Sequence, residues 1–176
     1  MKTFLITGGA GLIGSHIAKK LLPNNKVIIF DAFVQYISPL ESDYQSYLEY
    51  RFNYSSDNLT IVRGDCRNKF EVQRTIQKYQ PDIIIHLAAM PIADLSFSHS
   101  EEAIDSILHG TVNILETIKD TDHLERFLYI SSSMIYGDFK QIPASEEHPK
   151  EPKDIYGGTK YAGEILTQTF ARRCFV

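Results

Sequence analysis

The sequence predicts an α/β fold built on a doubly wound parallel sheet. Short apolar runs rich in β-branched residues alternate along the chain with longer runs whose apolar residues recur at helical spacing. The short runs are apolar at nearly every position, which is typical of strands that are covered on both faces. Such alternation implies right-handed crossovers between parallel strands, and a length of 176 residues favours one domain over two.

The elements follow one another in a regular order. The strand candidates are Thr3–Thr7, Val27–Phe30, Leu59–Val62, Ile83–Leu87 and Phe127–Ser131. The helix candidates are Leu12–Leu22, Phe70–Tyr79, Ala103–Ile118 and Tyr156–Phe170. Each helix candidate carries an apolar stripe, so each is expected to cover one face of the sheet.

The segment Phe33–Asn58 interrupts this order. It separates the second and third strands and carries Tyr36, Tyr44, Tyr47, Tyr50 and Tyr54. A structureless loop of this length is unusual in a compact domain, so a short helix is expected around Glu41–Arg51. Two interpretations stay open: an insertion that rests on the surface, or a contact with a partner or substrate.

Composition excludes several classes of protein. The net charge is −4 and there is no long Lys/Arg run, so the chain lacks the electrostatic footprint of nucleic-acid-binding proteins. Cys66 and Cys174 are too few and too far apart for a disulfide framework or a metal site. No stretch approaches the roughly 20 apolar residues of a membrane span, and none forms a signal peptide. We therefore expect a cytoplasmic protein without a nucleic-acid or membrane partner.

A glycine-rich stretch joins the first strand to the first helix. Phosphate binding at a helix N-terminus needs a tight turn, close access to the backbone, and a small residue where helix packs on strand. Gly8 or Gly9, Gly11 and Gly14 meet these needs, and Leu12 and Ile13 complete the expected cofactor-binding stretch. This strand-loop-helix context predicts a dinucleotide-binding, Rossmann-like domain.

Asp31 ends the second strand, 20 residues after Gly11. A carboxylate at this place accepts hydrogen bonds from both ribose hydroxyls of an adenosine and repels a 2′-phosphate, so NAD is expected in preference to NADP. The alternative is a simple turn residue after a strand.

Further cofactor-binding candidates follow the third and fourth strands. Asp65, which precedes Cys66, is placed either to meet the adenine edge or to serve as a helix N-cap. Ala88 and Ala89 are small enough to let the backbone approach a cofactor. His86 shows no ligand spacing with another histidine, so a packed, hydrogen-bonded imidazole is expected rather than a metal ligand, and no metal is predicted.

Tyr156 and Lys160 form a Tyr-x-x-x-Lys pair on an expected helix, where positions i and i+4 share a face. A phenol with an ordinary pKa of about 10 is a poor base at neutral pH, and an adjacent cation lowers that pKa. The pair follows the glycine-rich loop and the serine-rich strand end Ser131-Ser132-Ser133, and this order predicts an active site.

The motifs occur in one order along the whole chain. They are Thr7-Gly8-x-x-Gly11-x-x-Gly14, Asp31, Gly64-Asp65, His86-x-Ala88-Ala89, Ser131-Ser132-Ser133-x-x-Tyr136-Gly137 and Tyr156-x-x-x-Lys160. This series resembles the extended short-chain dehydrogenase/reductase family, in its nucleotide-sugar epimerase/dehydratase branch. The resemblance implies that Ser132 is catalytic, that Tyr156 is the general base or acid, and that Lys160 lowers the pKa of Tyr156 and holds the nicotinamide ribose. It also implies NAD as the cofactor, a nucleotide sugar as the substrate and a transient keto sugar.

The sequence departs from the family pattern at three places. Ile107 stands where an Asn is usual in the family's Asn-x-x-Gly-Thr pattern, and Thr159 replaces the usual Ser. The chain ends at Val176, where the next strand of the sheet is expected. We therefore expect residues 1–176 to form an NAD-binding domain that stops before the last strands and the substrate domain, and that turns over no sugar alone.

The residues after Ser132 bear on the reaction type. Dehydratases and decarboxylases of this branch carry an acidic residue just after the catalytic Ser or Thr, whereas Ser133 and Met134 follow here. A nucleotide-sugar epimerase is therefore the leading hypothesis. A dehydratase or decarboxylase of the same family, and a non-catalytic NAD-binding module, are the alternatives. The resemblance also implies a homodimer through the helices over 103–118 and 156–170, although packing on the sheet explains their apolar residues equally well.

Overall fold

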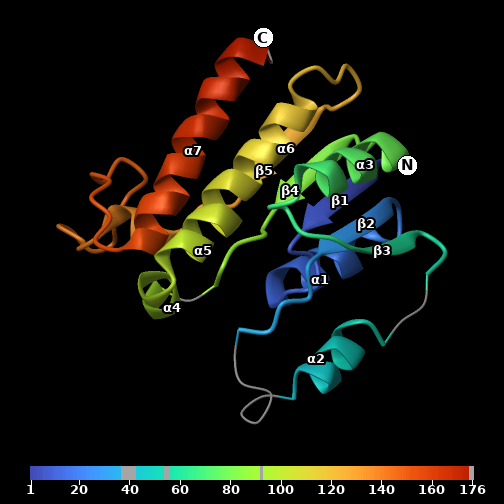
Figure 1. The fold of residues 1–176 in the computed structure, drawn as a ribbon, viewed down its shortest axis with the longest axis horizontal. Coiled ribbons are helices and arrows are strands. Elements are labelled where there is room, and N and C mark those ends of the chain that lie inside the picture. The colour runs from blue at the N-terminus through green and yellow to red at the C-terminus, as the bar shows by residue number, and fades with distance from the viewer. Residues whose placement is uncertain (37–42, 54–55, 92, 175–176) are drawn as a thin grey trace.

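A five-stranded parallel sheet in the order β3-β2-β1-β4-β5 forms the centre of the molecule (Figure 1). The computed structural model describes residues 1–36, 43–53, 56–91 and 93–174. The strands are β1 (Thr3–Thr7), β2 (Lys26–Asp31), β3 (Leu59–Arg63), β4 (Ile83–His86) and β5 (Arg126–Tyr129). Because β1 pairs with β2 on one side and with β4 on the other, the strand order reverses at β1. In open parallel sheets, ligands bind at such a switch point.

Helices cover both faces of the sheet, which confirms the predicted doubly wound α/β fold. On one face, α3 (Lys69–Tyr79), α6 (Gly110–Ile118) and α7 (Ile155–Cys174) pack over the sheet through apolar residues of one core cluster. On the other face, α1 (Leu12–Leu21) and α2 (Tyr44–Arg51) contribute to a second cluster. Figure 1 shows α6 and α7 side by side, in agreement with their contacts.

The two edge strands differ from the central ones. Ile6 on β1 and Ile29 on β2 are fully buried, whereas Ile61 on β3 and Leu128 on β5 are 47% and 40% exposed. The expectation that all five strands are buried on both faces is therefore wrong for β3 and β5, because each has a neighbouring strand on one side only. The apolar runs of β3 and β5 therefore predict more side-chain burial than these strands have.

The helix expected over Ala103–Ile118 consists of three consecutive segments. These are α5 (Ser100–Ile104), the π-helical segment η1 (Asp105–His109) and α6. A π-helical turn inside an α-helix locally widens the helix and is often found at functional sites. Ile107, which stands where the family usually has an Asn, is buried within this segment.

The short elements were the hardest to predict. The sequence did not predict α4 (Ala93–Ser98) or the 3₁₀ helix η2 (Ser133–Tyr136), because each is too short to show a helical period. The helix expected around Glu41–Arg51 is present as α2, capped by Asp43, which accepts a hydrogen bond from the Ser46 amide. Residues 41 and 42 lie outside the described part of the chain. Within that part, no helix is long and apolar enough to cross a membrane.

Candidate active site

A cavity of about 480 Å³ opens at the carboxyl ends of the strands. Every residue that the sequence predicted to bind a cofactor lines this cavity. They are Gly8, Gly11, Leu12, Ile13, Gly14, Asp31, Asp65, Cys66, Ala88, Ala89, Tyr156 and Lys160. The cavity lining thus brings residues from five strand ends and three helix N-termini to one place at the switch point of the sheet.

The glycines of the glycine-rich loop let its backbone pack closely and contact a ligand directly. Gly8 has a φ of +67°, and a Cβ there would lie 2.7 Å from the backbone nitrogen of Ala88. A Cβ on Gly14 would lie 2.6 Å from the Cα of Gly9, so the helix packs directly on the loop. Gly11, the N-cap of α1, supplies no side-chain cap, which leaves the first-turn amides at the cavity for an anionic group.

Asp31 holds the loops on either side of it. Its Oδ2 accepts a hydrogen bond from the Ala10 amide at 2.9 Å, and its Oδ1 accepts one from the Phe33 amide at 2.8 Å. Phe33 has a φ of +55°, which is strained for a residue with a side chain. Asp31 therefore has the turn role that the sequence left open, and it also lines the cavity.

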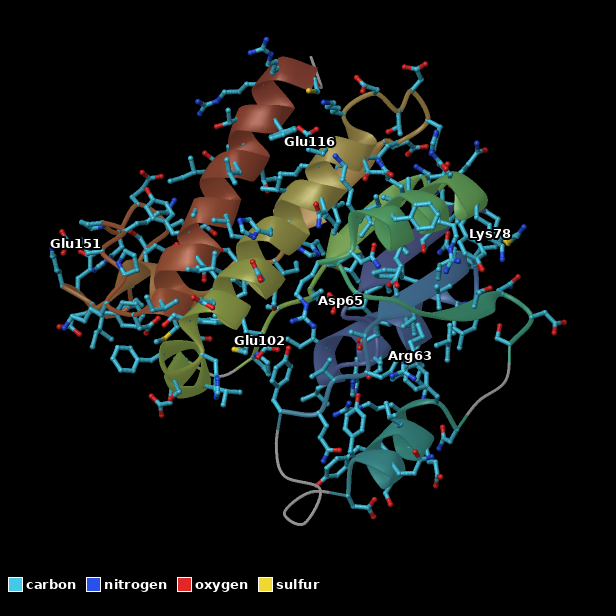
Figure 2. The ribbon with its side chains drawn as sticks, viewed as in Figure 1. Arg63, Asp65, Lys78, Glu102, Glu116 and Glu151 are labelled. Atoms are coloured by element: carbon cyan, nitrogen blue, oxygen red, sulfur yellow. The ribbon has the colours of Figure 1, made fainter. Side chains whose placement is uncertain are left out.

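Asp65 does not cap α3. Asn68 is the N-cap, and its side chain accepts hydrogen bonds from Phe70 and Glu71, so the N-cap interpretation of Asp65 is wrong. Asp65 instead forms an ion pair with Arg67 at 2.7 Å, and Arg67 reaches Glu102 at 3.4 Å. Figure 2 shows Asp65 and Glu102 on the two sides of this bridge between the sheet edge and α5.

Cys66, which follows Asp65, is buried at the wall of the cavity. Burial raises the pKa of its thiol far above the ordinary value, and the Asp65 carboxylate raises it further. The thiol is therefore protonated at neutral pH and is a poor nucleophile. The Cys66 side chain therefore packs in the cavity wall and has no chemical role there.

His86, the last residue of β4, is a packed, hydrogen-bonded imidazole, as predicted. Its Nδ1 lies 2.6 Å from Thr7 Oγ1, and its Nε2 lies 3.1 Å from Thr111 Oγ1. Burial, together with the charge of Lys160, lowers the pKa of His86 to about 3. The imidazole is therefore neutral at pH 7.

We expect the stability of the fold to fall as the pH drops from 6.5 toward 3, because an unfolded His86 binds a proton in that range and the folded one does not. Between pH 7 and 4.5, His86 should lower the free energy of unfolding by about 2.5 kcal/mol. His86→Gln, which keeps a donor and an acceptor, should flatten this part of the urea-unfolding profile. The control His123→Gln, at an exposed histidine, should retain the wild-type slope. Parallel profiles for all three proteins would contradict this role of His86.

Tyr156 lies in the first turn of α7 and lines the cavity. Burial raises its pKa, a hydrogen bond with Ser132 opposes that rise, and the Asp154 carboxylate adds to it. The expectation that Lys160 lowers the Tyr156 pKa below its ordinary value is therefore wrong: the pKa is raised. Desolvation of the phenol outweighs the effect of any nearby cation.

Lys160 is 3% exposed, although it carries an amine. Its Nζ donates a hydrogen bond to the Ile130 carbonyl at 2.5 Å and lies 4.9 Å from the centre of the Tyr129 ring. Burial lowers the pKa of Lys160 to about 8. The ammonium is thus held by the end of β5, one helical turn from Tyr156.

Ser132 lies behind Tyr156. It is the N-cap of η2, where its Oγ accepts a hydrogen bond from the Met134 amide at 3.2 Å, and it also bonds to Tyr156. Ser132 does not itself line the cavity, whereas its neighbour Ser131 does. The Ser131 hydroxyl is buried and has no hydrogen-bond partner among the described residues, so the cavity wall offers a polar group to a ligand.

The tyrosine-rich segment contributes to the cavity, which agrees with the contact interpretation that the sequence left open, although the sequence did not identify the residues involved. Tyr36, Tyr44 and Arg51 all line the cavity, so this segment is more than an insertion on the surface. Tyr47 and Tyr50 remain 53% and 76% exposed, which agrees with the surface interpretation for that face of α2. The number of tyrosines was the available signal, but it could not tell which ones turn inward.

Comparisons with known proteins agree with this architecture. The family model described as GDP-mannose 4,6 dehydratase matches residues 5–174. A trifunctional UDP-glucose 4,6-dehydratase/UDP-4-keto-6-deoxy-D-glucose 3,5-epimerase/UDP-4-keto-L-rhamnose-reductase of Arabidopsis thaliana is 32% identical, over 97% of this chain and 25% of its own. The dTDP-D-glucose 4,6-dehydratase of Homo sapiens is 30% identical, over 96% of this chain and 47% of its own.

Solved structures show the same fold. The UDP-glucuronic acid 4-epimerase of Bacillus cereus, in complex with UDP-glucuronic acid and NAD, has a TM-score of 0.85 and 27% identity over 99% of this chain and 54% of its own. The UDP-glucose 4-epimerase of Brucella ovis, in complex with NAD, has a TM-score of 0.81 and 26% identity over 99% of this chain and 49% of its own.

This chain spans between a quarter and about half of the length of these relatives. Its sequence motifs, strand order and cavity agree with the family match over residues 5–174. The chain belongs to the GDP-mannose 4,6 dehydratase family, in agreement with the nucleotide-sugar epimerase/dehydratase branch that its motifs indicated.

Proposed function

We propose that residues 1–176 form an NAD-binding domain, with the dinucleotide in the cavity at the switch point. The close approach of Gly8 to Ala88, the uncapped N-terminus of α1 and the Ser131 hydroxyl, which has no partner in the described part of the chain, fit such a ligand. Leu12 and Ile13, which are 63% and 61% exposed, line the cavity in the first turn of α1. The B. cereus and B. ovis enzymes of the same fold were solved with NAD, which supports the choice of cofactor.

We expect the chain to bind NAD more tightly than NADP, because the Asp31 carboxylate lines the cavity and repels a 2′-phosphate. Asp31→Ala should weaken NAD binding about tenfold or more and relax the preference, since a hydrogen bond to a charged group is worth roughly 1.5 to 3 kcal/mol. Calorimetric titration of both cofactors measures this. Asp57→Ala, at an exposed carboxylate outside the cavity, is the matched control. Equal affinity of the unsubstituted chain for the two cofactors would refute the prediction.

We further propose that this domain is the catalytic half of a nucleotide-sugar epimerase. The observation that carries the proposal is that Tyr156 and the buried Lys160 line the same cavity, and that Tyr156 is hydrogen-bonded to Ser132. Tyr156 would take the proton from a sugar hydroxyl and later return it, while Ser132 hydrogen-bonds the reacting oxygen. Lys160 would hold the nicotinamide ribose. The chemistry that NAD supplies when bound is hydride acceptance and return.

The residues beside Ser132 favour epimerisation over dehydration. Ser133 and Met134 begin η2, where an extra acid or base would be needed to eliminate water, and a thioether can neither donate nor accept a proton in this role. A 4,6-dehydratase is the second candidate, because the curated relatives from A. thaliana and H. sapiens bear that name. A non-catalytic NAD-binding module is the third.

The test joins this chain to the C-terminal half of the B. cereus relative, of which this chain covers 54%, and follows UDP-glucose, UDP-glucuronic acid and dTDP-glucose by NMR. Interconversion of C4 epimers without net NADH supports the proposal. Accumulation of a 4-keto-6-deoxy sugar, or release of carbon dioxide, would assign the protein to the alternative enzymes. Binding of NAD with no conversion of any sugar would favour the module. The chain alone should turn over no sugar, because a near-attack geometry needs the sugar to be held.

We also propose a cytoplasmic location and a homodimer. Both described cysteines are free thiols, which suits a reducing compartment. Leu108 and Val112 on the predicted dimer helices are only half-buried by the sheet, so they can contact a second copy. A dimeric mass at micromolar concentration is expected by light scattering, and a strictly monomeric mass would remove the dimer from the proposal.

A further inference from the structure

Three cationic side chains line the cavity, and two of them, Lys160 and Arg51, have no anionic partner among the described residues. Arg67 is paired with Asp65 and Glu102, and Lys160 donates to the Ile130 carbonyl. Arg51 lines the same cavity, and within the described residues no carboxylate lies at ion-pair distance from it. A guanidinium at a cavity wall without a carboxylate is available for an anionic group of a ligand.

Arg51 is held at a defined place beside the glycine-rich loop. Its Nη1 donates a hydrogen bond to the Ala10 carbonyl at 2.9 Å, although 41 residues separate the two in sequence. The Ala10 amide donates to Asp31 Oδ2 at 2.9 Å. Arg51 and Asp31 thus hold the carbonyl and the amide of one residue, Ala10, and stand on neighbouring parts of the same cavity wall.

Tyr44 lies within reach of both charges. Burial raises the pKa of its phenol, the Asp31 carboxylate raises it further, and the Arg51 guanidinium lowers it. The Asp31 carboxylate and the Arg51 guanidinium therefore both act on the part of the cavity beside Tyr44. Asp31 is the group expected to meet the adenosine ribose, so Arg51 lies beside the position of the ribose 2′-substituent.

We propose that Arg51 is a second determinant of cofactor specificity, which binds a 2′-phosphate and so limits the preference for NAD over NADP that Asp31 sets. This inference rests on the proposed NAD site. Asp31 favours two free ribose hydroxyls, while Arg51 offers planar, charged N–H donors that suit a phosphate. Both Asp31 oxygens already accept a backbone N–H, which fixes the carboxylate in place and leaves the guanidinium to meet the additional charge.

The test measures the dissociation constants of NAD and NADP for the 176-residue chain and three variants by calorimetry. Arg51→Gln keeps a donor for the Ala10 carbonyl but removes the charge, so the ratio of the NADP constant to the NAD constant should rise about tenfold. Arg51→Lys keeps the charge but not the planar N–H donors, so its ratio should lie between those of the wild type and Arg51→Gln. Arg63→Gln is the matched control, because Arg63 pairs with Asp31 in the sheet register, is exposed and does not line the cavity.

Each result decides between stated alternatives. An equal change of both constants in Arg51→Gln would mean that Arg51 only positions the loop, which overturns the inference and leaves the NAD site intact. An equal shift of the ratio in Arg63→Gln would mean a general charge effect, which also overturns it. Failure of the unsubstituted chain, folded by circular dichroism, to bind either cofactor would overturn the proposed NAD site itself.

Discussion

Replacing Tyr156 by Phe should lower the turnover of the chain joined to a relative's C-terminal half by about a thousandfold. A loss of this size is expected when a general acid-base group is removed. Phe keeps the ring that packs at the start of α7 but has no hydroxyl to exchange a proton with the sugar or to bond to Ser132. NAD affinity should change little, because the phenol is one of many groups that line the cavity. The loss should therefore appear in kcat rather than in cofactor binding.

Tyr161→Phe is the matched control for this experiment. Tyr161 lies on the same helix, outside the cavity, with Lys150 over its ring. It should retain wild-type turnover. The Tyr156 phenol has a raised pKa, so the wild-type rate should increase with pH below that pKa as the phenolate forms. A Tyr156→Phe enzyme within tenfold of wild type would remove Tyr156 from the chemistry.

Replacing Gly8 by Val should abolish measurable NAD binding and lower the free energy of unfolding by several kcal/mol. At a φ of +67° a β-branched residue is strained, at a cost of about 1 to 3 kcal/mol. The added Cβ would also lie 2.7 Å from the Ala88 backbone nitrogen, so the glycine-rich loop must move away from the end of β4. Urea unfolding and cofactor titration measure the two effects separately.

Gly158→Ala is the control for the glycine substitution. A Cβ at Gly158 meets nothing within 4 Å, and the residue lies inside α7. Alanine there should leave NAD binding unchanged and raise stability by up to about 1 kcal/mol, because glycine is a poor helix former. If Gly8→Val bound NAD as tightly as Gly158→Ala does, NAD binding would not depend on the close packing of the glycine-rich loop against β4.

The sequence predicted the fold well because the buried strands carry a strong local signal. Ile28, Ile29 and Ile84 belong to apolar runs that read correctly as central strands. The edge strands read the same way, since periodicity cannot show how many neighbours a strand has. The π-helical segment around Ile107 was invisible for a similar reason: it disturbs the helical spacing over a single turn only.

The candidate site was predicted from short motifs, and their limits are physical. Gly8, Asp31 and Tyr156 sit next to elements whose ends meet at one edge of the sheet, so their convergence follows from topology. Arg51 comes from a segment without a motif, and only its contact with Ala10 reveals its place. The Tyr156 pKa was predicted in the wrong direction because spacing along a helix shows a nearby amine but not the burial of the phenol.

The hydrogen bonds of His86 fix which ring nitrogen donates and which accepts. The Thr111 hydroxyl donates its single hydrogen to the Ile107 carbonyl at 2.6 Å, so toward His86 it can only accept. His86 must therefore carry its proton on Nε2, and its Nδ1 must accept from Thr7. The imidazole is locked in one tautomer, and a second proton on Nδ1 would face the Thr7 hydroxyl hydrogen. Because His86 does not line the cavity, its fixed tautomer serves to order the Thr7 and Thr111 hydroxyls between β1, β4 and α6 rather than to exchange protons with a bound ligand.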